Sequence, residues 1–109
     1  MNYNNLIYEI KETIKQNFDP DKIILFGSFA YGKPSEESDI DLLIIKNLPK
    51  DKIRENRFYI RTLLRNIILT YRKDIDILLY RDKDIKERIE IGDLFIKEIY
   101  EKGNTIYAK

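Results

Sequence analysis

Two aspartates separated by one residue, Asp39 and Asp41, are the residues of this sequence best placed to do chemistry. In an extended strand both carboxylates leave the same face, roughly 7 Å apart along the backbone. Magnesium and similar hard cations prefer such oxygen ligands and keep some of their water. Two such ions about 4 Å apart can clamp the attacking and leaving oxygens of a phosphoryl transfer. A third carboxylate from a neighbouring strand would complete a site of this kind.

A glycine–serine pair, Gly27-Ser28, directly follows the apolar run over 23–26 and could supply the other half of the site. Glycine lets a phosphate approach the backbone closely. A helical turn over 28–31 would point its free N–H groups at that phosphate, and the serine hydroxyl adds a donor. Each signal alone is weak, because an Asp-x-Asp strand is often only a solvated face and Gly-Ser turns are common. Their position at strand ends in one contiguous unit makes the combination more specific.

The surrounding pattern predicts the elements that would position these residues. Apolar residues at helical spacing predict three helices, over 2–17, 51–71 and 82–101, with Asp19-Pro20 ending the first and Gly103 the last. Short isoleucine-rich runs predict strands over 22–26, 39–46 and 74–80, with a possible short edge strand over 105–107. The order is α-β-turn-β-α-β-α. We expect one α/β (α+β) domain over 1–109, with a small mixed sheet of three to four strands and helices packed mainly on one face.

Composition narrows the chemistry further. The 109 residues contain no cysteine and no histidine, which excludes disulfides, thiolate sites and the commonest general base. Twenty basic residues nearly balance nineteen acidic ones, so no net field draws the whole molecule to nucleic acid or membrane. The sequence lacks a signal peptide and a bilayer-spanning run, so we expect a soluble, cytoplasmic protein without a membrane partner. Because the core is modest, an active site would be shallow or completed by a partner.

Four arginines lie along the helix predicted over 51–71, at positions 54, 57, 61 and 65. Arg57, Arg61 and Arg65 share a face because they are spaced by four. The favoured interpretation is a solvated face with ion pairs. The alternative is a docking stripe for an acidic partner or for RNA, although nothing else in the sequence indicates nucleic-acid binding.

Residues 25–44, LFGSFAYGKPSEESDIDLLI, resemble the signature of the DNA polymerase beta-like nucleotidyltransferase superfamily. In that signature Gly-Ser is followed after ten residues by Asp-x-Asp, which is the spacing between Gly27-Ser28 and Asp39-Ile40-Asp41. Gly32, Ser38 and Leu42 also fit the fuller pattern. Small size and strand order make the chain look like the minimal nucleotidyltransferases over nearly its whole length.

The resemblance implies a nucleotidyltransferase fold with two Mg²⁺ ions, both ligated by Asp39 and Asp41. The family's third carboxylate is best matched by Asp76 in DIDILLY, which would bind the catalytic metal and help deprotonate the attacking hydroxyl. Asp74 faces the same way and is the rival. Asp76 is favoured because it lies deeper in the strand, where positions are better fixed.

The resemblance also places ATP as the substrate, with its triphosphate beside Gly27, Ser28 and Ser38. One departure concerns the arginine that family members often carry just after Gly-Ser, near the phosphates. This chain has Phe29-Ala30-Tyr31 there, and Lys33 is the residue that could substitute.

The implied function is magnesium-dependent transfer of a nucleoside monophosphate, AMP from ATP, to a hydroxyl acceptor. Small family members are commonly paired with a separate helical HEPN-type protein, as antitoxins that add AMP to a tyrosine of that toxin. One alternative is a non-catalytic module that neutralises a helical partner by contact; the missing arginine argues for it and the three aspartates argue against it. The other is a small-molecule nucleotidyltransferase of the antibiotic-adenylating kind, disfavoured because no second, pocket-forming domain is present.

Overall fold

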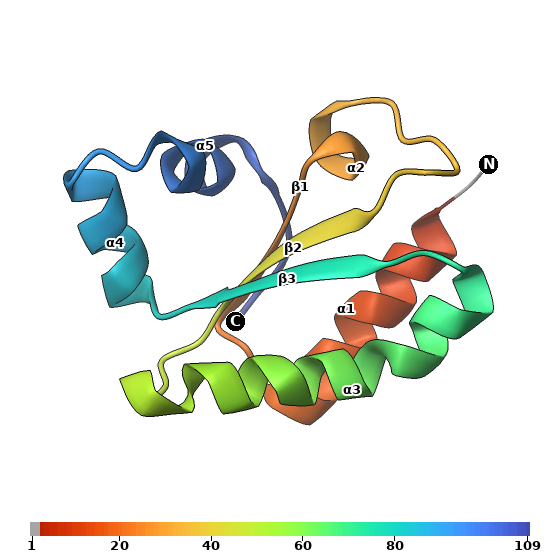
Figure 1. Cartoon of the computed structure of the whole chain (residues 1–109), viewed down its shortest axis with the longest axis horizontal. Coiled ribbons are helices and arrows are strands. Elements are labelled where there is room, and N and C mark those ends of the chain that lie inside the picture. Colours follow the sequence, from red (N-terminus) through yellow and green to blue (C-terminus); the bar gives the residue numbers. More distant parts are fainter. Residues whose placement is uncertain (1–2) are drawn as a thin grey trace.

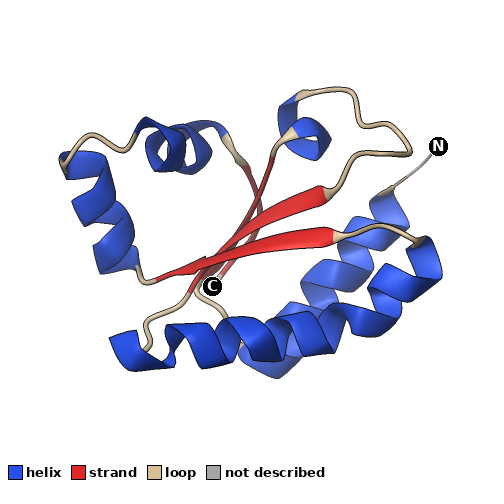
Figure 2. Ribbon diagram, viewed as in Figure 1, coloured by secondary structure: helices blue, strands red, loops and turns tan. Residues whose placement is uncertain are grey.

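Four strands form one sheet with helices on both of its faces (Figures 1 and 2). The computed structural model describes residues 3–109, so the predicted helix start at residue 2 lies outside the described residues. In chain order the elements are α1 (Asn4–Phe18), β1 (Lys22–Phe26), α2 (Ser28–Tyr31), β2 (Ile40–Ile45), the 3-10 turn η1 (Lys50–Lys52), α3 (Ile53–Tyr71), β3 (Ile75–Tyr80), α4 (Asp82–Glu90), α5 (Leu94–Lys102) and β4 (Asn104–Ala108). The predicted mixed α/β fold is confirmed. No described helix has both the length and the apolar character needed to cross a membrane.

The strand order of the sheet is β3-β2-β1-β4. β1 pairs antiparallel with β2 and with β4, whereas β2 and β3 are parallel. Helix α3 joins the two parallel strands, as the long crossover between such strands requires. As a result, the end of β1 and the starts of β2 and β3 lie at the same end of the sheet, where the candidate site is found.

Apolar side chains are buried on both faces of the sheet. On one face α1 and α3 pack against the strands through Leu6, Ile10, Ile14, Ile60 and Leu64. On the other face α4 and α5 pack through Ile85, Ile96 and Ile99. Two-sided burial explains why 42–45 is a continuous apolar run rather than an alternating one. We expected the helices to pack mainly on one face of the sheet. The two long helices, α1 and α3, do so, and the two short helices, α4 and α5, cover the other face.

The single helix predicted over 82–101 is wrong, because a turn at Ile91-Gly92-Asp93 separates α4 from α5. Gly92 has a φ of 98°, in the left-handed region that favours glycine. Asp93 then caps α5, with its Oδ1 accepting a hydrogen bond from the Ile96 amide at 3.0 Å. The apolar periodicity continues across this turn and hides it. The adjacent glycine and aspartate, a helix stop followed by a helix start, are the signal that could have revealed it.

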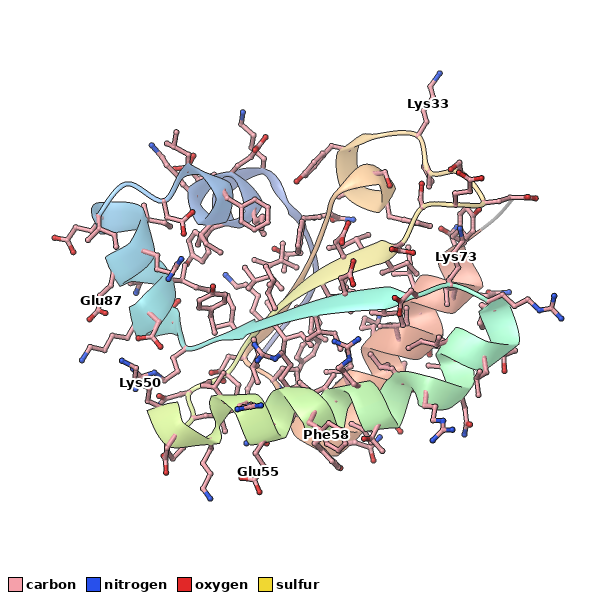
Figure 3. All side chains as sticks on the ribbon, in the orientation of Figure 1. Lys33, Lys50, Glu55, Phe58, Lys73 and Glu87 are labelled. Carbon is pink, nitrogen blue, oxygen red and sulfur yellow. The ribbon has the colours of Figure 1, made fainter. Side chains whose placement is uncertain are left out.

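Four arginines lie along α3. Arg54, Arg61 and Arg65 are exposed and Arg57 is half-buried. Phe58, which Figure 3 labels on α3, is 73% exposed. Within residues 3–109 none of the four arginines forms an ion pair. The favoured interpretation of these arginines was a solvated face with ion pairs. The part of the chain that the structure describes has the exposed arginines of such a face but not the ion pairs.

Candidate active site

Asp41 and Asp76 lie side by side across the parallel strand pair. They are register partners in β2 and β3, and neighbouring strands are only about 4.8 Å apart, so both side chains leave the same face of the sheet. Burial is the largest of the effects that together raise the pKa of Asp41 to about 6; the others are the charge of Asp76, a hydrogen bond with Asp76 and the charge of Asp39. Asp39 and Asp76, the other two carboxylates singled out from the sequence, therefore both act on Asp41 at one end of the sheet.

Asp39 and Asp74 occupy equivalent places, each one residue before its strand. The Asp74 carboxylate accepts a hydrogen bond from the Ile75 amide at 2.9 Å. Asp39 contributes to the raised pKa of Asp41, whereas Asp74 is not among the groups that cause it. Of the two rivals for the third carboxylate, Asp76 thus has the closer electrostatic link to Asp41.

Gly27 brings the backbone directly against the Asp41 carboxylate. It follows Phe26, the register partner of Asp41 in the antiparallel pair of β1 and β2. Its φ of 73° and ψ of −158° lie in a region that essentially only glycine adopts. A Cβ at this position would lie 2.2 Å from Oδ2 of Asp41. The missing side chain is therefore what allows the carboxylate and the start of α2 to meet.

Residues 28–31 form the short helical turn that the sequence allowed as an alternative to a loop. The amides of Ala30 and Tyr31 both donate to the Gly27 carbonyl, at 3.0 and 3.2 Å. Those of Ser28 and Phe29 precede these bonds and have no acceptor within the turn. These two amides are the donors that the start of the turn could offer to an anion beside the carboxylates.

Two other residues expected at the nucleotide lie in the loop between α2 and β2. Lys33 is exposed, and Figure 3 shows its side chain pointing outward from that loop. The Ser38 hydroxyl accepts a hydrogen bond from the Ser35 amide at 2.9 Å, within the same loop. The structure therefore does not bring Lys33 to the carboxylates, and it uses Ser38 to hold the loop in shape.

Lys73 is a residue of this region that sequence reasoning missed. Its side chain is buried, and its ammonium donates to the carbonyls of Ser35, Glu36 and Ser38. These carbonyls belong to the loop that leads into Asp39. No local pattern distinguishes Lys73 from the other lysines, because its partners are backbone atoms 35 to 38 residues earlier in the chain.

The chemistry of the donor set fits a hard divalent cation. The charges of Asp76 and Asp39 oppose ionisation of Asp41, and a cation placed among the three carboxylates would relieve that repulsion. Throughout residues 3–109, no three acidic side chains already stand in an arrangement that could hold a metal ion. Binding would therefore require side chains to turn toward the ion, which is a small change for Asp39 and Asp76 because both are exposed.

A defined cavity lies elsewhere in the molecule. It has a volume of about 290 Å³ and is lined in part by Lys50, Arg57, Tyr80 and Asp84. Tyr80 is at the far end of β3, four residues from Asp76 and so roughly 13 Å away. The candidate site itself has two exposed carboxylates, in keeping with the shallow site expected of so small a core.

The raised pKa of Asp41 predicts a pH dependence for both metal binding and stability. Lowering the pH from about 7.5 to 5 should weaken Mg²⁺ affinity, by roughly tenfold per unit below pH 6, because the ion and a proton compete for this carboxylate. The pKa of Asp41 in the folded protein exceeds its ordinary value of 3.8, so the stabilisation that Asp41 gives the metal-free protein is complete below pH 4 and lost as the pH rises through 6. Calorimetric Mg²⁺ titrations and urea unfolding across this range measure the two effects. A Mg²⁺ affinity that stays flat between pH 5 and 7.5 would contradict the prediction.

Residues 8–109 match the family model described as polymerase beta, nucleotidyltransferase. The chain belongs to this nucleotidyltransferase family. Two relatives of this nucleotidyltransferase come from Methanocaldococcus jannaschii, and both are named as candidate protein adenylyltransferases. MJ1305 is 40% identical over 85 residues, which are 75% of this chain and 57% of the relative, so the match spans little more than half of that protein. MJ0604 is 30% identical over 109 residues, covering 98% of this chain and all of the relative.

A solved structure supports the same fold for this nucleotidyltransferase. The crystal structure of a candidate nucleotidyltransferase from Sulfolobus solfataricus superimposes with a TM-score of 0.61, over 96% of this chain and 79% of that one. The two sequences are 22% identical, so this likeness concerns the fold alone.

Proposed function

We propose that this protein transfers AMP from ATP to a hydroxyl group on a second protein, with Mg²⁺ ions held by Asp39, Asp41 and Asp76. The observation that carries the proposal is the meeting of Asp41 and Asp76 in register on adjacent strands, with the bare backbone of Gly27 against Asp41. Carboxylates next to an open glycine turn suit the charge and the shape of a metal-bound triphosphate. The names of the two relatives agree with a protein acceptor.

The proposed reaction is a single displacement at phosphorus. The acceptor oxygen forms a bond to the α-phosphorus while the bond from that phosphorus to the bridging oxygen breaks, and pyrophosphate leaves. The hydroxyl proton passes to the carboxylate of Asp76, which lies beside Asp41. Bound Mg²⁺ supplies charge neutralisation for the attacking and leaving oxygens. The Ser28 hydroxyl and the amides of Ser28 and Phe29 hold the phosphates of the leaving group.

The proposed acceptor is a tyrosine of a helical HEPN-type partner, for which the protein acts as an antitoxin. The site supports a macromolecular acceptor because Asp39 and Asp76 are exposed, so a side chain on another protein can reach them. The domain, proposed to be single over residues 1–109, offers little surface of its own to grip a small acceptor. The partner would therefore present the hydroxyl.

Label transfer tests this proposal. The protein is incubated with Mg²⁺, ATP labelled at the α-phosphate and the product of the adjacent gene, and label on that product is measured. Wild type should transfer label, whereas Asp39→Asn should lower the rate by about 10²-fold or more, because one metal ligand loses its charge. Asp51→Asn, at a second exposed aspartate, is the matched control and should transfer label normally.

The same experiment separates the proposal from a rival function. The absence of an arginine after Gly27-Ser28 favours a non-catalytic module that neutralises its partner by contact. In that case no label moves, and neutralisation survives the combined Asp39→Asn and Asp41→Asn variant. Label on a small hydroxylated molecule instead of a protein would point to small-molecule modification.

A further inference from the structure

We propose that Lys73 is a positioning residue that locks the loop between α2 and β2 and thereby holds the two halves of the candidate site together. The inference rests on the proposed function for its catalytic consequence and on the contacts of Lys73 for its physical basis. Figure 3 shows Lys73 between the start of β3 and this loop. Lys73 is 5% exposed, and it is the one buried charged or polar side chain among the described residues.

The ammonium of Lys73 is surrounded by oxygen atoms and aromatic rings. It donates to the carbonyls of Ser35 at 2.8 Å, Glu36 at 2.5 Å and Ser38 at 2.9 Å. Three acceptors use all three donors of an ammonium group. Across residues 3–109 no carboxylate forms an ion pair with it. A buried charge is costly unless it is compensated, and here the backbone of the loop provides the compensation.

Two aromatic rings complete this environment. The ammonium lies 5.5 Å from the ring centre of Tyr3 and 5.8 Å from that of Phe29, distances at which a cation is attracted to a ring face. The two rings meet edge to face, with centres 4.8 Å apart. Phe29 belongs to α2 and follows Ser28 directly. Lys73 therefore contacts the phosphate side of the site as well as the loop.

The contacts of Lys73 connect three segments that meet at the site. Phe29 places Ser28, the Ser38 carbonyl places the neighbouring Asp39, and Lys73 itself stands three residues before Asp76. The loop over 32–39 has no helix or strand of its own. Besides the hydrogen bonds between Ser35 and Ser38, this cation gathers three of the loop's carbonyls at one point. All three donors are used within the protein, so the ammonium is not free to bind a phosphate. Its effect on catalysis is therefore indirect.

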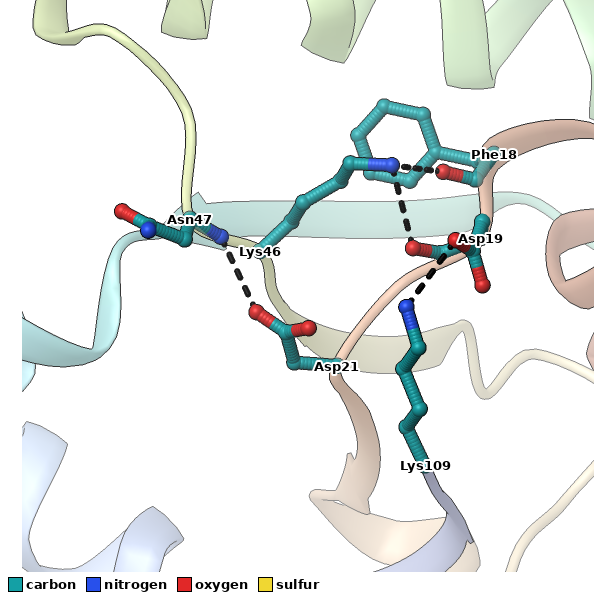
Figure 4. Close-up of polar contacts among 6 residues, drawn as sticks. All are labelled: Phe18, Asp19, Asp21, Lys46, Asn47 and Lys109. Carbon is teal, nitrogen blue, oxygen red and sulfur yellow. Dashed lines mark hydrogen bonds and ion pairs between the residues drawn. The ribbon is translucent and has the colours of Figure 1, made fainter.

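Lys46 provides a matched control at the other end of the sheet (Figure 4). Its ammonium also donates to backbone carbonyls, those of Phe18 and Asp19, and lies 4.8 Å from the ring centre of Phe18. It follows the last residue of β2, whereas the candidate site is at the start of that strand. Lys46→Met and Lys73→Met remove the same kind of interaction, one far from the site and one beside it.

The test compares these two variants with wild type at a temperature at which all are folded. Lys73→Met should raise KM for ATP and lower kcat/KM by about 10²-fold, because small displacements of reacting groups have effects of that size. It should also weaken Mg²⁺ binding and speed deuterium exchange at residues 33–39 by at least roughly tenfold, since the loop opens more often. Lys46→Met should leave Mg²⁺ affinity and kinetics within about twofold of wild type.

Mg²⁺ affinity and deuterium exchange do not depend on catalysis. If the wild-type protein transfers no nucleotide, the proposed function is wrong, but these two measurements still test the positioning role of Lys73. Wild-type values of Mg²⁺ affinity and loop exchange in Lys73→Met would overturn the positioning role. Equal losses in both variants would also overturn it, because they would reflect general stability. If Lys73→Met does not fold, Lys73→Arg, which keeps the charge but not the compact donor geometry, takes its place. That variant should show the same raised KM, and a wild-type KM would count against the inference.

Discussion

Replacing Asp76 with asparagine is expected to lower the rate of nucleotide transfer by about 10³-fold, because the proposed metal ligand and the proposed proton acceptor are lost together. The same change removes the charge that, after burial, most strongly raises the pKa of Asp41. We therefore expect the pKa of Asp41 to fall toward its ordinary value of 3.8. Transfer assays measure the first effect, and carboxyl chemical shifts followed by NMR over a pH titration measure the second.

Asp74→Asn is the control for this experiment. Asp74 lies two residues from Asp76, on the same side of the chain, and its Oδ1 accepts a hydrogen bond from the Ile75 amide. Asparagine keeps an oxygen in that position, so the turn into β3 should be preserved and transfer should stay within about twofold of wild type. If Asp74→Asn abolishes transfer while Asp76→Asn does not, the third carboxylate has been assigned to the wrong residue.

Gly27→Ala should have a comparably large effect, through geometry instead of charge. The new Cβ would approach Oδ2 of Asp41 to 2.2 Å, so the carboxylate or the start of α2 must move. Gly27 has a φ of 73°, so an alanine at this position adds backbone strain of about 1–3 kcal/mol. We expect a lower free energy of unfolding and a loss of transfer of about 10²-fold, because displacements near 1 Å reduce rates by that much. Urea unfolding and label transfer measure the two effects.

Gly92→Ala separates the strain of this backbone conformation from the contact with Asp41. Gly92 also has a positive φ, of 98°, but a Cβ there would meet no atom within 4 Å. This variant should lose stability of the order of 1 kcal/mol and keep normal transfer, because the turn between α4 and α5 does not contact the carboxylates. A similar loss of transfer in both variants would show that Gly27 acts through stability alone.

The strands that form the site could be predicted from the sequence because their limits are marked locally. Lys22–Phe26 is bounded by Pro20 on one side and Gly27 on the other, and the predicted and observed strands coincide. The observed β2 is one residue shorter at each end than the strand predicted over 39–46, and β3 begins one residue later than predicted, so Asp39 and Asp74 precede the pleated segments. Parallel pairing of these strands then fixes the register that brings Asp41 to Asp76.

The rest of the fold depended on contacts that no local pattern records. The turn at Gly92 was hidden by apolar periodicity that suits one long helix and two short ones equally well. Both halves of the broken helix cover the second face of the sheet, α4 through Ile85 and α5 through Ile96. The loop of the candidate site was equally hard to predict. Lys73 is important because it binds three carbonyls that are distant in sequence. Residue spacing also could not show that the Lys33 side chain points outward. The catalytic roles of the three aspartates remain predictions.

The position of β3 in the strand order has a consequence for self-association. β3 is the outermost strand on its side of the sheet, so one line of its backbone N–H and C=O groups lacks a partner strand among residues 3–109. Five of its six residues are apolar or aromatic, a composition that invites pairing with the same strand of another molecule. Asp76 is its one charge, and a charge in such a segment opposes edge-to-edge aggregation. The carboxylate proposed to bind magnesium thus also protects the edge of the sheet.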